Sequence, residues 1–448
     1  MISFLKNKLT GKRVLILGFG QEGISTYKVL VENIEGLHIG IADRDEQIME
    51  NELLREFDIS ELHCGENYLN SLINYDFVIK SPGVSLSGIE IPSSVEMSSQ
   101  TSMFIEFYRQ QIIGVTGTKG KSTTCSLIHF LLDKCNLKNV LIGNIGKPAF
   151  DSIAEIDSET IIVFELSAHQ LENITSSPHI SVLLNLFPEH LDYFNSFEKY
   201  SEAKLNIVKF QRENDEFIFS EQFKDADLIV GGRHCFGESK TCEAQRTKEG
   251  IWFNQDGEDL FLSVENVSLT GFHNLMNVMA AMLAVKQCNV ELRNVINYIG
   301  DFKGLSHRLE FIGIHGGIKF YNDSISTIPQ STIAAVKTLE SVDTLILGGY
   351  DRGLDYSILT NFLVDSKIRN YIFLGKAGEI MYAQLKHKLE LKKGLWKVKD
   401  LENAFEIIKQ HTIKGGSCLL SPAAASYDQF RNFEHRGDLY STLAKAIV

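Results

Sequence analysis

Three short apolar runs along the chain lead into glycine, and each is followed by a helical pattern of apolar positions. The runs occupy residues 13–18, 111–116 and 343–348 and are rich in Val, Ile and Leu. Continuous runs of this kind are typical of strands that are buried on both faces of a parallel sheet. The pattern therefore predicts an α/β fold built from three strand–helix units.

The length of the chain supports division into domains. A single hydrophobic core seldom grows beyond roughly 250–300 residues, and this chain has 448. We predict domains at residues 1–101, 102–303 and 304–448, with boundaries before the second strand and after the helical segment 275–287. The first is Rossmann-like, the central one is of the P-loop ATPase type, and the third is a Rossmann-like α/β domain.

Composition narrows the class of protein. The formal net charge is −13, which argues against nucleic-acid binding because that needs a basic surface. Neither a signal peptide nor an 18-residue apolar run is present, so we expect a cytoplasmic protein without a membrane segment. The seven cysteines include no C-x-x-C pair, and we expect them to be unpaired.

A glycine-rich turn in the middle of the chain predicts ATP binding. Residues 117–122 read Gly-Thr-Lys-Gly-Lys-Ser between a predicted strand and helix. In such a turn, backbone N–H groups and the helix N-terminus hold phosphate oxygens. Lys121 would reach the β- and γ-phosphates, and the Ser122 hydroxyl would ligate Mg²⁺. The spacing departs from G-x-x-x-x-G-K-[ST], because Val115 stands where the first glycine is expected.

Polar residues follow the next two predicted strands. Glu165 ends the apolar run 160–165, and residues 185–192 contain Asn185, Glu189, His190 and Asp192. Loops at sheet ends are where α/β proteins place their ligands, and carboxylates suit Mg²⁺. Each of these residues is also compatible with a purely structural role.

Two further positions are ambiguous when taken alone. Lys204 lies in a predicted helix and would ordinarily be a solvated surface lysine. Asn274 opens another predicted helix, where it could read an adenine edge or cap the helix.

Taken together, these segments resemble the Mur ligase family of ATP-dependent amide ligases. The motifs that carry the resemblance are G-T-K-G-K-S (117–122), G-N-I-G (143–146), F-E-L-S-A-H-Q-L-E (164–172), N-L-F-P-E-H-L-D (185–192), A-K-L (203–205), G-F-H-N (271–274), G-L-S-H-R-L-E (304–310), N-D-S (322–324) and the C-terminal run 419–437. The resemblance extends through nearly the whole chain and implies cytoplasmic synthesis of a peptidoglycan precursor.

The resemblance implies three domains that hold, in order, a UDP-linked substrate, ATP and an amino acid. The substrate would be UDP-N-acetylmuramoyl-L-alanine, whose carboxylate attacks the γ-phosphate to give an acyl phosphate that glutamate then attacks. The implied catalytic residues are Lys121, Glu165, His190 and Lys204. Two Mg²⁺ ions would be held by Ser122, Glu165, His190 and a carbamylated Lys204.

The resemblance also implies where each substrate binds. The ATP site would comprise Gly117, Thr118, Lys119, Gly120, Lys121, Ser122, Thr123, Asn274, Arg308 and Asp323. The UDP-substrate site would comprise Phe19, Gly20, Gln21, Glu22, Asp43, Arg44, Ser81, Asn144 and His190. The glutamate site would comprise Thr327, Arg352, Ser426 and Phe433.

Residues 18–23 and Asp43 also match the dinucleotide-binding pattern G-x-G-x-x-G with a later acidic residue, which alone would suggest a nicotinamide dehydrogenase. A folylpolyglutamate synthetase and a P-loop regulatory protein are further alternatives.

Within the favoured family, residues 325–329 read Ile-Ser-Thr-Ile-Pro where many D-glutamate ligases have K-A-T-N after D-S. D-glutamate is favoured and L-glutamate is the alternative. We expect a monomer with small-molecule partners only.

Overall fold

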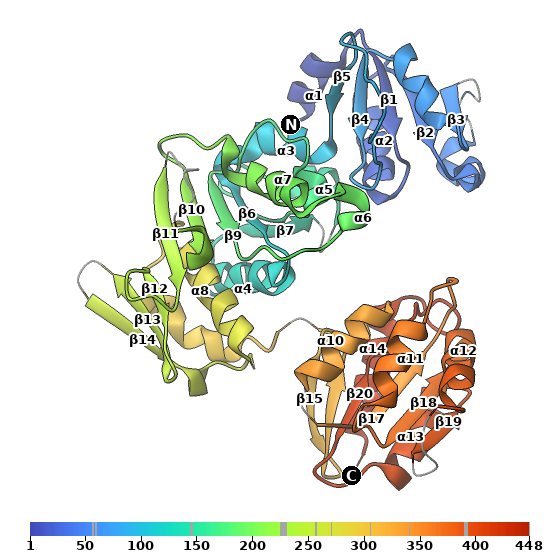
Figure 1. The fold of residues 1–448 in the computed structure, drawn as a ribbon. Helices are drawn as coiled ribbons and strands as arrows, with labels where there is room; N and C mark the ends of the chain where they lie inside the picture. The colour runs from blue at the N-terminus through green and yellow to red at the C-terminus, as the bar shows by residue number, and fades with distance from the viewer. Residues whose placement is uncertain are drawn as a thin grey trace. The chain divides into compact units, whose positions relative to one another are not determined.

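The chain forms two compact units, residues 1–302 and 303–448. The computed structural model describes residues 1–55, 58, 61–143, 147–224, 231–255, 258–269, 271–304, 306–339, 341–388 and 393–447. It contains three separate sheets, two in the first unit and one in the second (Figure 1). The α/β class predicted from the three apolar runs is confirmed. The predicted boundary at residue 101 falls inside helix α3 (Gln100–Tyr108), and the domain limits stay predictions.

The first sheet is parallel, with strand order β3-β2-β1-β4-β5. Its strands are β1 (Arg13–Leu17), β2 (His38–Asp43), β3 (Leu62–Cys64), β4 (Phe77–Lys80) and β5 (Glu96–Ser98). Helices α1 (Ile2–Leu9) and α2 (Gln21–Asn33) pack against it. Four of the five residues of β1 are fully buried, because the sheet is covered on both faces, as a continuous apolar run predicts.

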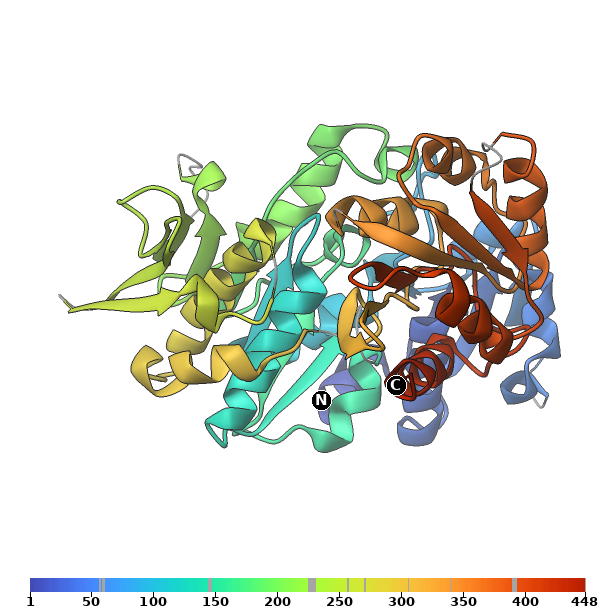
Figure 2. The same cartoon turned by 90° about the horizontal axis from the view of Figure 1, so that it is seen from below.

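The second sheet has nine strands in the order β14-β13-β12-β11-β10-β9-β6-β8-β7. The strands are β6 (Ile112–Thr116), β7 (Asn139–Gly143), β8 (Ile161–Glu165), β9 (Ile180–Leu183), β10 (Glu216–Ser220), β11 (Gly232–Gly237), β12 (Ala244–Arg246), β13 (Gly250–Gln255) and β14 (Glu258–Ser263). All neighbours from β12 to β7 pair in parallel, while β13 and β14 pair antiparallel at one end (Figure 2).

Helices cover both faces of the second sheet. On one face lie α4 (Lys121–Lys134) and α8 (Phe272–Lys286), whose apolar residues share one core with the sheet. On the other lie α3 and α7 (Phe197–Lys209), whose core also takes in apolar residues of the first sheet. The shorter helices are α5 (Ala168–Leu171), α6 (Leu191–Phe194) and α9 (Leu292–Val295). The shared core explains why residues 1–302 form one unit.

The second unit contains a six-stranded sheet with order β15-β16-β20-β17-β18-β19. Its strands are β15 (Glu310–His315), β16 (Ile318–Asn322), β17 (Val342–Gly348), β18 (Asn370–Leu374), β19 (Gly394–Lys397) and β20 (Ser417–Leu420). Only β15 runs antiparallel to its neighbour. The helices are α10 (Pro329–Thr338), α11 (Ser357–Val364), α12 (Gly375–Leu385), α13 (Leu401–His411) and α14 (Phe433–Lys445). All seven residues of β17 are buried.

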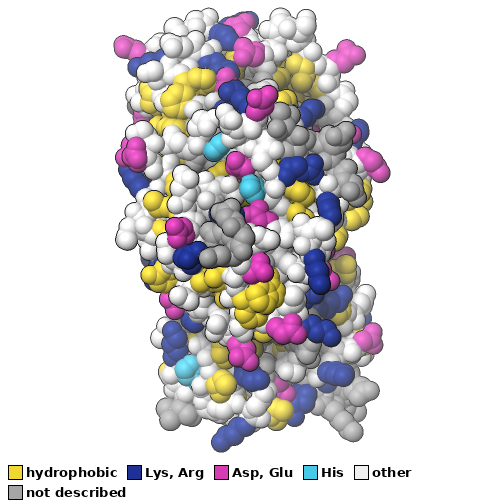
Figure 3. Space-filling view, turned by 90° about the vertical axis from the view of Figure 1, so that its left-hand side faces the viewer, with side chains coloured by type: hydrophobic (Ala, Val, Ile, Leu, Met, Phe, Trp, Pro, Cys, Tyr) yellow, Lys and Arg dark blue, Asp and Glu magenta, His cyan; other side chains and the backbone are white. Residues whose placement is uncertain are grey.

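The surface carries both signs of charge, and the described helices are short or polar. The net charge of the chain is −13. On the face drawn in Figure 3, acidic and basic side chains are interspersed, so the basic ones do not form a continuous stripe there. Within the described parts of the chain, every helix is too short or too polar to cross a lipid bilayer.

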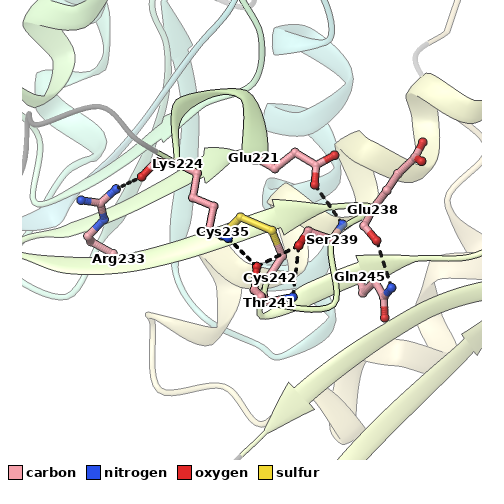
Figure 4. The surroundings of a disulfide bond; sticks show 9 residues. All are labelled: Glu221, Lys224, Arg233, Cys235, Glu238, Ser239, Thr241, Cys242 and Gln245. Atoms are coloured by element: carbon pink, nitrogen blue, oxygen red, sulfur yellow. Dashed lines mark hydrogen bonds between the residues drawn. A yellow bond between two sulfur atoms is a disulfide. The ribbon is translucent and has the colours of Figure 1, made fainter.

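The cysteines require one correction. Cys235 and Cys242 form a disulfide with a Cα–Cα distance of 4.7 Å, whereas the sequence predicted no pairing. The turn between β11 and β12 brings them together, because Ser239 accepts from the Cys242 N–H at 3.1 Å and donates its own N–H to Glu221 at 2.9 Å (Figure 4). An odd cysteine count argues against a framework of disulfides but leaves room for one local pair.

Candidate functional site

The phosphate loop joins β6 to α4, as predicted. Gly117 and Gly120 have φ values of 154° and 91°, a region that favours glycine. A Cβ on Gly120 would lie 2.3 Å from the Asn277 side-chain oxygen, and one on Gly117 would lie 2.9 Å from Leu184. The loop therefore needs glycine at both positions, for its backbone conformation and for its close contact with α8 and the strand end.

The loop is held in place by residues from the next strand end. The Thr118 N–H donates to the Asn185 carbonyl at 2.9 Å, and the Asn185 side chain bonds the backbone N–H and carbonyl of Lys119, both at 2.9 Å. The Thr118 hydroxyl lies 3.0 Å from the Tyr200 hydroxyl on α7. These contacts fix the shape of the loop.

Lys121 is folded back over the loop that precedes it. Its Nζ donates to the carbonyls of Gly117 at 2.9 Å and Thr118 at 3.1 Å. Burial lowers the pKa of Lys121, while the carboxylates of Glu165 and Glu189 raise it. The ammonium thus lies at the mouth of the loop, where a γ-phosphate would be bound.

Lys204 is buried, unlike an ordinary surface lysine. It is 2% exposed on α7, and its Nζ donates to the Thr116 hydroxyl at 3.3 Å. Burial lowers the pKa of Lys204 well below its usual value, and the Lys121 ammonium lowers it further. The long helix places this amine beside the end of β6, next to the phosphate loop.

One cavity brings several of the predicted catalytic residues together. It has a volume of about 290 Å³ and is lined by Pro82, Gly83, Lys121, Ser167, Ala168, His169, Glu189, His190, Tyr200 and Lys204. Glu165 is fully buried at the end of β8, and its charge acts on both Lys121 and Lys204. Ser122 is 7% exposed at the start of α4.

The predicted Mg²⁺ ligands draw on different chemical groups. Among the described residues, His, Cys, Asp and Glu side chains do not form any group of three or more that could hold a metal ion. The predicted set instead combines one carboxylate, one imidazole, the Ser122 hydroxyl and the modified Lys204. Carboxylate and hydroxyl oxygens are the kinds of ligand that suit a hard cation such as Mg²⁺.

A second cavity, of about 900 Å³, lies at the ends of the strands of the first sheet. It is lined by Gly18, Gly20, Gln21, Glu22, Asp43, Arg44, Glu66, Tyr68, Leu69, Ser81, Pro82, Gly83, Val84 and Ser85. Six predicted UDP-substrate residues are therefore gathered here. Pro82 and Gly83 line both cavities, so the two are adjacent, and His190 lies in the smaller one.

One UDP-substrate prediction does not fit this cavity as a side-chain contact, and another falls on a residue that the structure does not describe. The Phe19 ring is 3% exposed and packs in the core, while its N–H donates to Asp43 at 2.6 Å. The Phe19 side chain points into the core because it lies just after β1, whose apolar residues are buried. Asn144 lies outside the described residues.

Asn274 is not a helix cap, since α8 begins at Phe272 with Gly271 as its N-cap. Its side-chain oxygen accepts from Asn277 at 3.1 Å, and Asn277 in turn touches the phosphate loop at Gly120. Sequence reasoning missed Asn277. Its place one helical turn after Asn274 is the signal that could have identified it.

The remaining predicted residues lie in the second unit. Asp323 is 3% exposed and accepts from the Leu309 N–H at 3.1 Å and the Ser421 hydroxyl at 2.7 Å. Burial raises the pKa of Asp323 to about 6. Arg308, close by in sequence, is exposed.

The predicted glutamate residues belong to loops of the same sheet. The guanidinium of the exposed Arg352 donates to the Thr327 carbonyl at 3.1 Å. Ser426 is 2% exposed. Phe433 begins α14, and its carbonyl accepts from the Ser324 hydroxyl at 2.8 Å.

Comparison with known proteins gives consistent matches along the chain. The family model of the Mur ligase middle domain matches residues 115–285, and that of the Mur ligase MurD-like N-terminal domain matches residues 12–101. The chain is 31% identical over 457 residues to the UDP-N-acetylmuramoylalanine–D-glutamate ligase of Clostridium perfringens, covering 99% of this chain and 98% of the relative. It is 32% identical over 468 residues to the enzyme of the same name from Elusimicrobium minutum, covering 99% and 100%.

Solved structures support the fold. The UDP-N-acetylmuramate-alanine ligase of Thermotoga maritima superposes with a TM-score of 0.55 at 18% identity, covering 96% of this chain and 98% of that one. The MurF ligase of Thermotoga maritima, in complex with ADP, gives a TM-score of 0.52 at 17% identity, covering 96% and 95%.

Proposed function

Because this chain belongs to the Mur ligase family, we propose that it joins D-glutamate to the alanyl carboxyl group of UDP-N-acetylmuramoyl-L-alanine while ATP is split to ADP and phosphate. The observation that carries this proposal is the cavity that joins Lys121, His190 and Lys204 and borders the cavity of the first sheet at Pro82 and Gly83. A UDP-linked substrate bound at the first sheet could extend its carboxylate toward the phosphate loop.

The first chemical step brings two anions together. An oxygen of the alanyl carboxylate attacks the γ-phosphorus, the bond to the β,γ-bridging oxygen breaks, and ADP leaves. Lys121 neutralises charge on the transferring group, as positioned cations do in phosphoryl transfer. Mg²⁺, held by Ser122, Glu165, His190 and modified Lys204, would supply further positive charge at the phosphates.

In the second step the neutral glutamate amine attacks the acyl carbon, the bond from that carbon to the phosphate-bearing oxygen breaks, and phosphate leaves with one carboxylate oxygen while the amine gives up a proton. Thr327, Arg352, Ser426 and Phe433 are the residues we assign to glutamate. A positive group at Arg352 suits an anionic substrate. The relatives from Clostridium perfringens and Elusimicrobium minutum are D-glutamate ligases by name, and neither supports the L-glutamate alternative.

We assign a carbamate to Lys204. The side chain is buried beside a second lysine, and in the described structure its amine has only the Thr116 hydroxyl as a hydrogen-bond partner. Reaction of the neutral amine with CO₂ forms an N–C bond, releases one proton and leaves a negatively charged, carboxylate-like group at the end of the side chain. That group would be an oxygen ligand for Mg²⁺ and a counter-charge for Lys121.

The other assignments follow the three parts of the chain. Residues 1–101 would hold the UDP group, 102–303 ATP, and 304–448 glutamate, with Asn274, Arg308 and Asp323 contacting the nucleotide. We propose that the protein acts in the cytoplasm as a monomer, on small molecules alone, in the synthesis of a peptidoglycan precursor.

A direct assay tests the assigned substrates. Purified protein given ATP, Mg²⁺ and UDP-N-acetylmuramoyl-L-alanine should release phosphate only when glutamate is added, with a clear preference for the D isomer. Phosphate release and a coupled mass measurement of the amide product are followed with D- and L-glutamate in parallel. Equal release without any glutamate, or a preference for L-glutamate, would contradict the proposal.

A further inference from the structure

Arg436, on α14, is the largest fully buried side chain in the described structure, at 1% exposure. Its Nε donates to the Ser324 hydroxyl at 2.9 Å, and its Nη2 donates to the Ser324 carbonyl at 2.8 Å. Its Nη1 donates to the carbonyls of Ala424 at 3.1 Å and Ala425 at 3.2 Å. One guanidinium therefore joins the loop after β16 to the loop after β20.

Buried charges are ordinarily paired with an opposite charge, and the Asp428 carboxylate is the opposite charge that acts on Arg436. The hydrogen bonds of Arg436 in the described structure, however, go to one hydroxyl and three carbonyl oxygens. Burial lowers the pKa of Arg436 to about 10, so the group is still charged at neutral pH. Hydrogen bonds from a charged donor are roughly twice as strong as neutral ones, and the planar guanidinium fixes their directions.

The two loops carry residues assigned above to different substrates. Asp323 directly precedes Ser324, and Ser426 directly follows Ala425. The Ala425 carbonyl also accepts from the Tyr350 N–H at 2.9 Å, which connects the loop of Arg352. Arg436 thus contacts the backbone of the two loops that carry the residues assigned to the nucleotide and to the glutamate substrate.

We infer that Arg436 is a positioning residue for the ligase reaction: it holds the loop of Ser426 in register with the loop of Asp323. This inference rests on the proposed function, because glutamate and ATP are assigned to those loops there. Arg436 itself does not touch substrate. A shift of about 1 Å in a positioning group can cost on the order of 10²-fold in rate, so loosening these loops should appear in the use of glutamate.

Two substitutions separate positioning from simple stability. Arg436→Lys keeps the charge but loses the fork that reaches both loops, and we expect the KM for glutamate to rise about 10-fold or more with a smaller change in kcat. Tyr440→Phe is the matched control on α14, since it removes a buried hydrogen bond of 3.0 Å to the Cys418 carbonyl away from these loops. It should lower the melting temperature and leave the KM unchanged.

The outcomes are distinct. A lower melting temperature with an unchanged KM for glutamate in Arg436→Lys would overturn the inference and leave the proposed function standing. If Arg436→Lys does not fold, Ser324→Ala removes the acceptor of Nε and should raise the same KM several-fold; an unchanged value would overturn the inference. An unaltered enzyme that forms no amide with glutamate would overturn the proposed function and this inference together.

Discussion

Replacing Lys121 with methionine should lower the rate of phosphate release by at least about 100-fold, the usual loss when one group that stabilises transition-state charge is removed. Methionine keeps much of the length and apolar body of lysine, so the loop should keep its shape. The ammonium that is folded over the carbonyls of Gly117 and Thr118 would be absent when charge develops on the γ-phosphoryl group. Steady-state phosphate release and circular dichroism measure the two effects.

Lys134→Met provides the matched control for this substitution. Lys134 is exposed in the last turn of the same helix, α4, and lies over the rings of Phe130 and Tyr298. The control should retain activity close to that of the unaltered protein. Turnover by Lys121→Met within a few-fold of the unaltered rate would remove Lys121 from the mechanism.

Replacing Lys204 with alanine should abolish ligase activity, and short carboxylates such as acetate should restore part of it. The substitution removes the proposed carbamate and leaves a space beside Thr116 that a small carboxylate can enter. Activity is measured by phosphate release over a series of acetate concentrations. Lys209→Ala, at the exposed end of the same helix, should be fully active and indifferent to acetate.

The carboxylate response is the informative part of that experiment. An inactive Lys204→Ala protein that shows no recovery with any short carboxylate would argue against the carbamate and leave a simple loss of the buried amine as the explanation. Full activity without added carboxylate would remove Lys204 from the site altogether.

Much of the fold could be predicted from the apolar pattern. The run at residues 343–348 became β17, and that at residues 111–116 became β6, within one residue at each end. These strands pair in parallel with both of their neighbours inside the sheets, where burial on both faces demands a continuous apolar run. The phosphate loop could be predicted from its glycines, because the positive φ values at Gly117 and Gly120 favour glycine over other residues.

Contacts between segments that are distant in the chain could not be predicted from the sequence. Asn277 lies against Gly120, and Asn185 bonds Lys119, only because α8 and the end of β9 converge on the loop. The burial of Lys204 depends on α7 packing against the sheet, and no local pattern distinguishes it from a surface lysine. Phe19 was assigned to substrate from its motif, although the strand before it continues into the core.

Two other features show the same limit. The Cys235–Cys242 pair depends on the turn between β11 and β12, and cysteine counting does not report the geometry of a turn. Arg436 stands in the segment F-E-H-R-G, where no local pattern marks it as buried, and the packing of α14 encloses it between two loops. The disulfide depends on the geometry of one turn, and the burial of Arg436 depends on a close approach between segments that are separate in the chain.

Isotope transfer tests the central claim, that the site passes the γ-phosphoryl group of ATP to the substrate carboxylate. UDP-N-acetylmuramoyl-L-alanine labelled with ¹⁸O in both carboxylate oxygens is converted with ATP, Mg²⁺ and D-glutamate, and the products are analysed by mass spectrometry. The mechanism predicts one ¹⁸O in the released phosphate and one in the new amide carbonyl for every bond formed. Phosphate that carries no ¹⁸O while amide accumulates would contradict it.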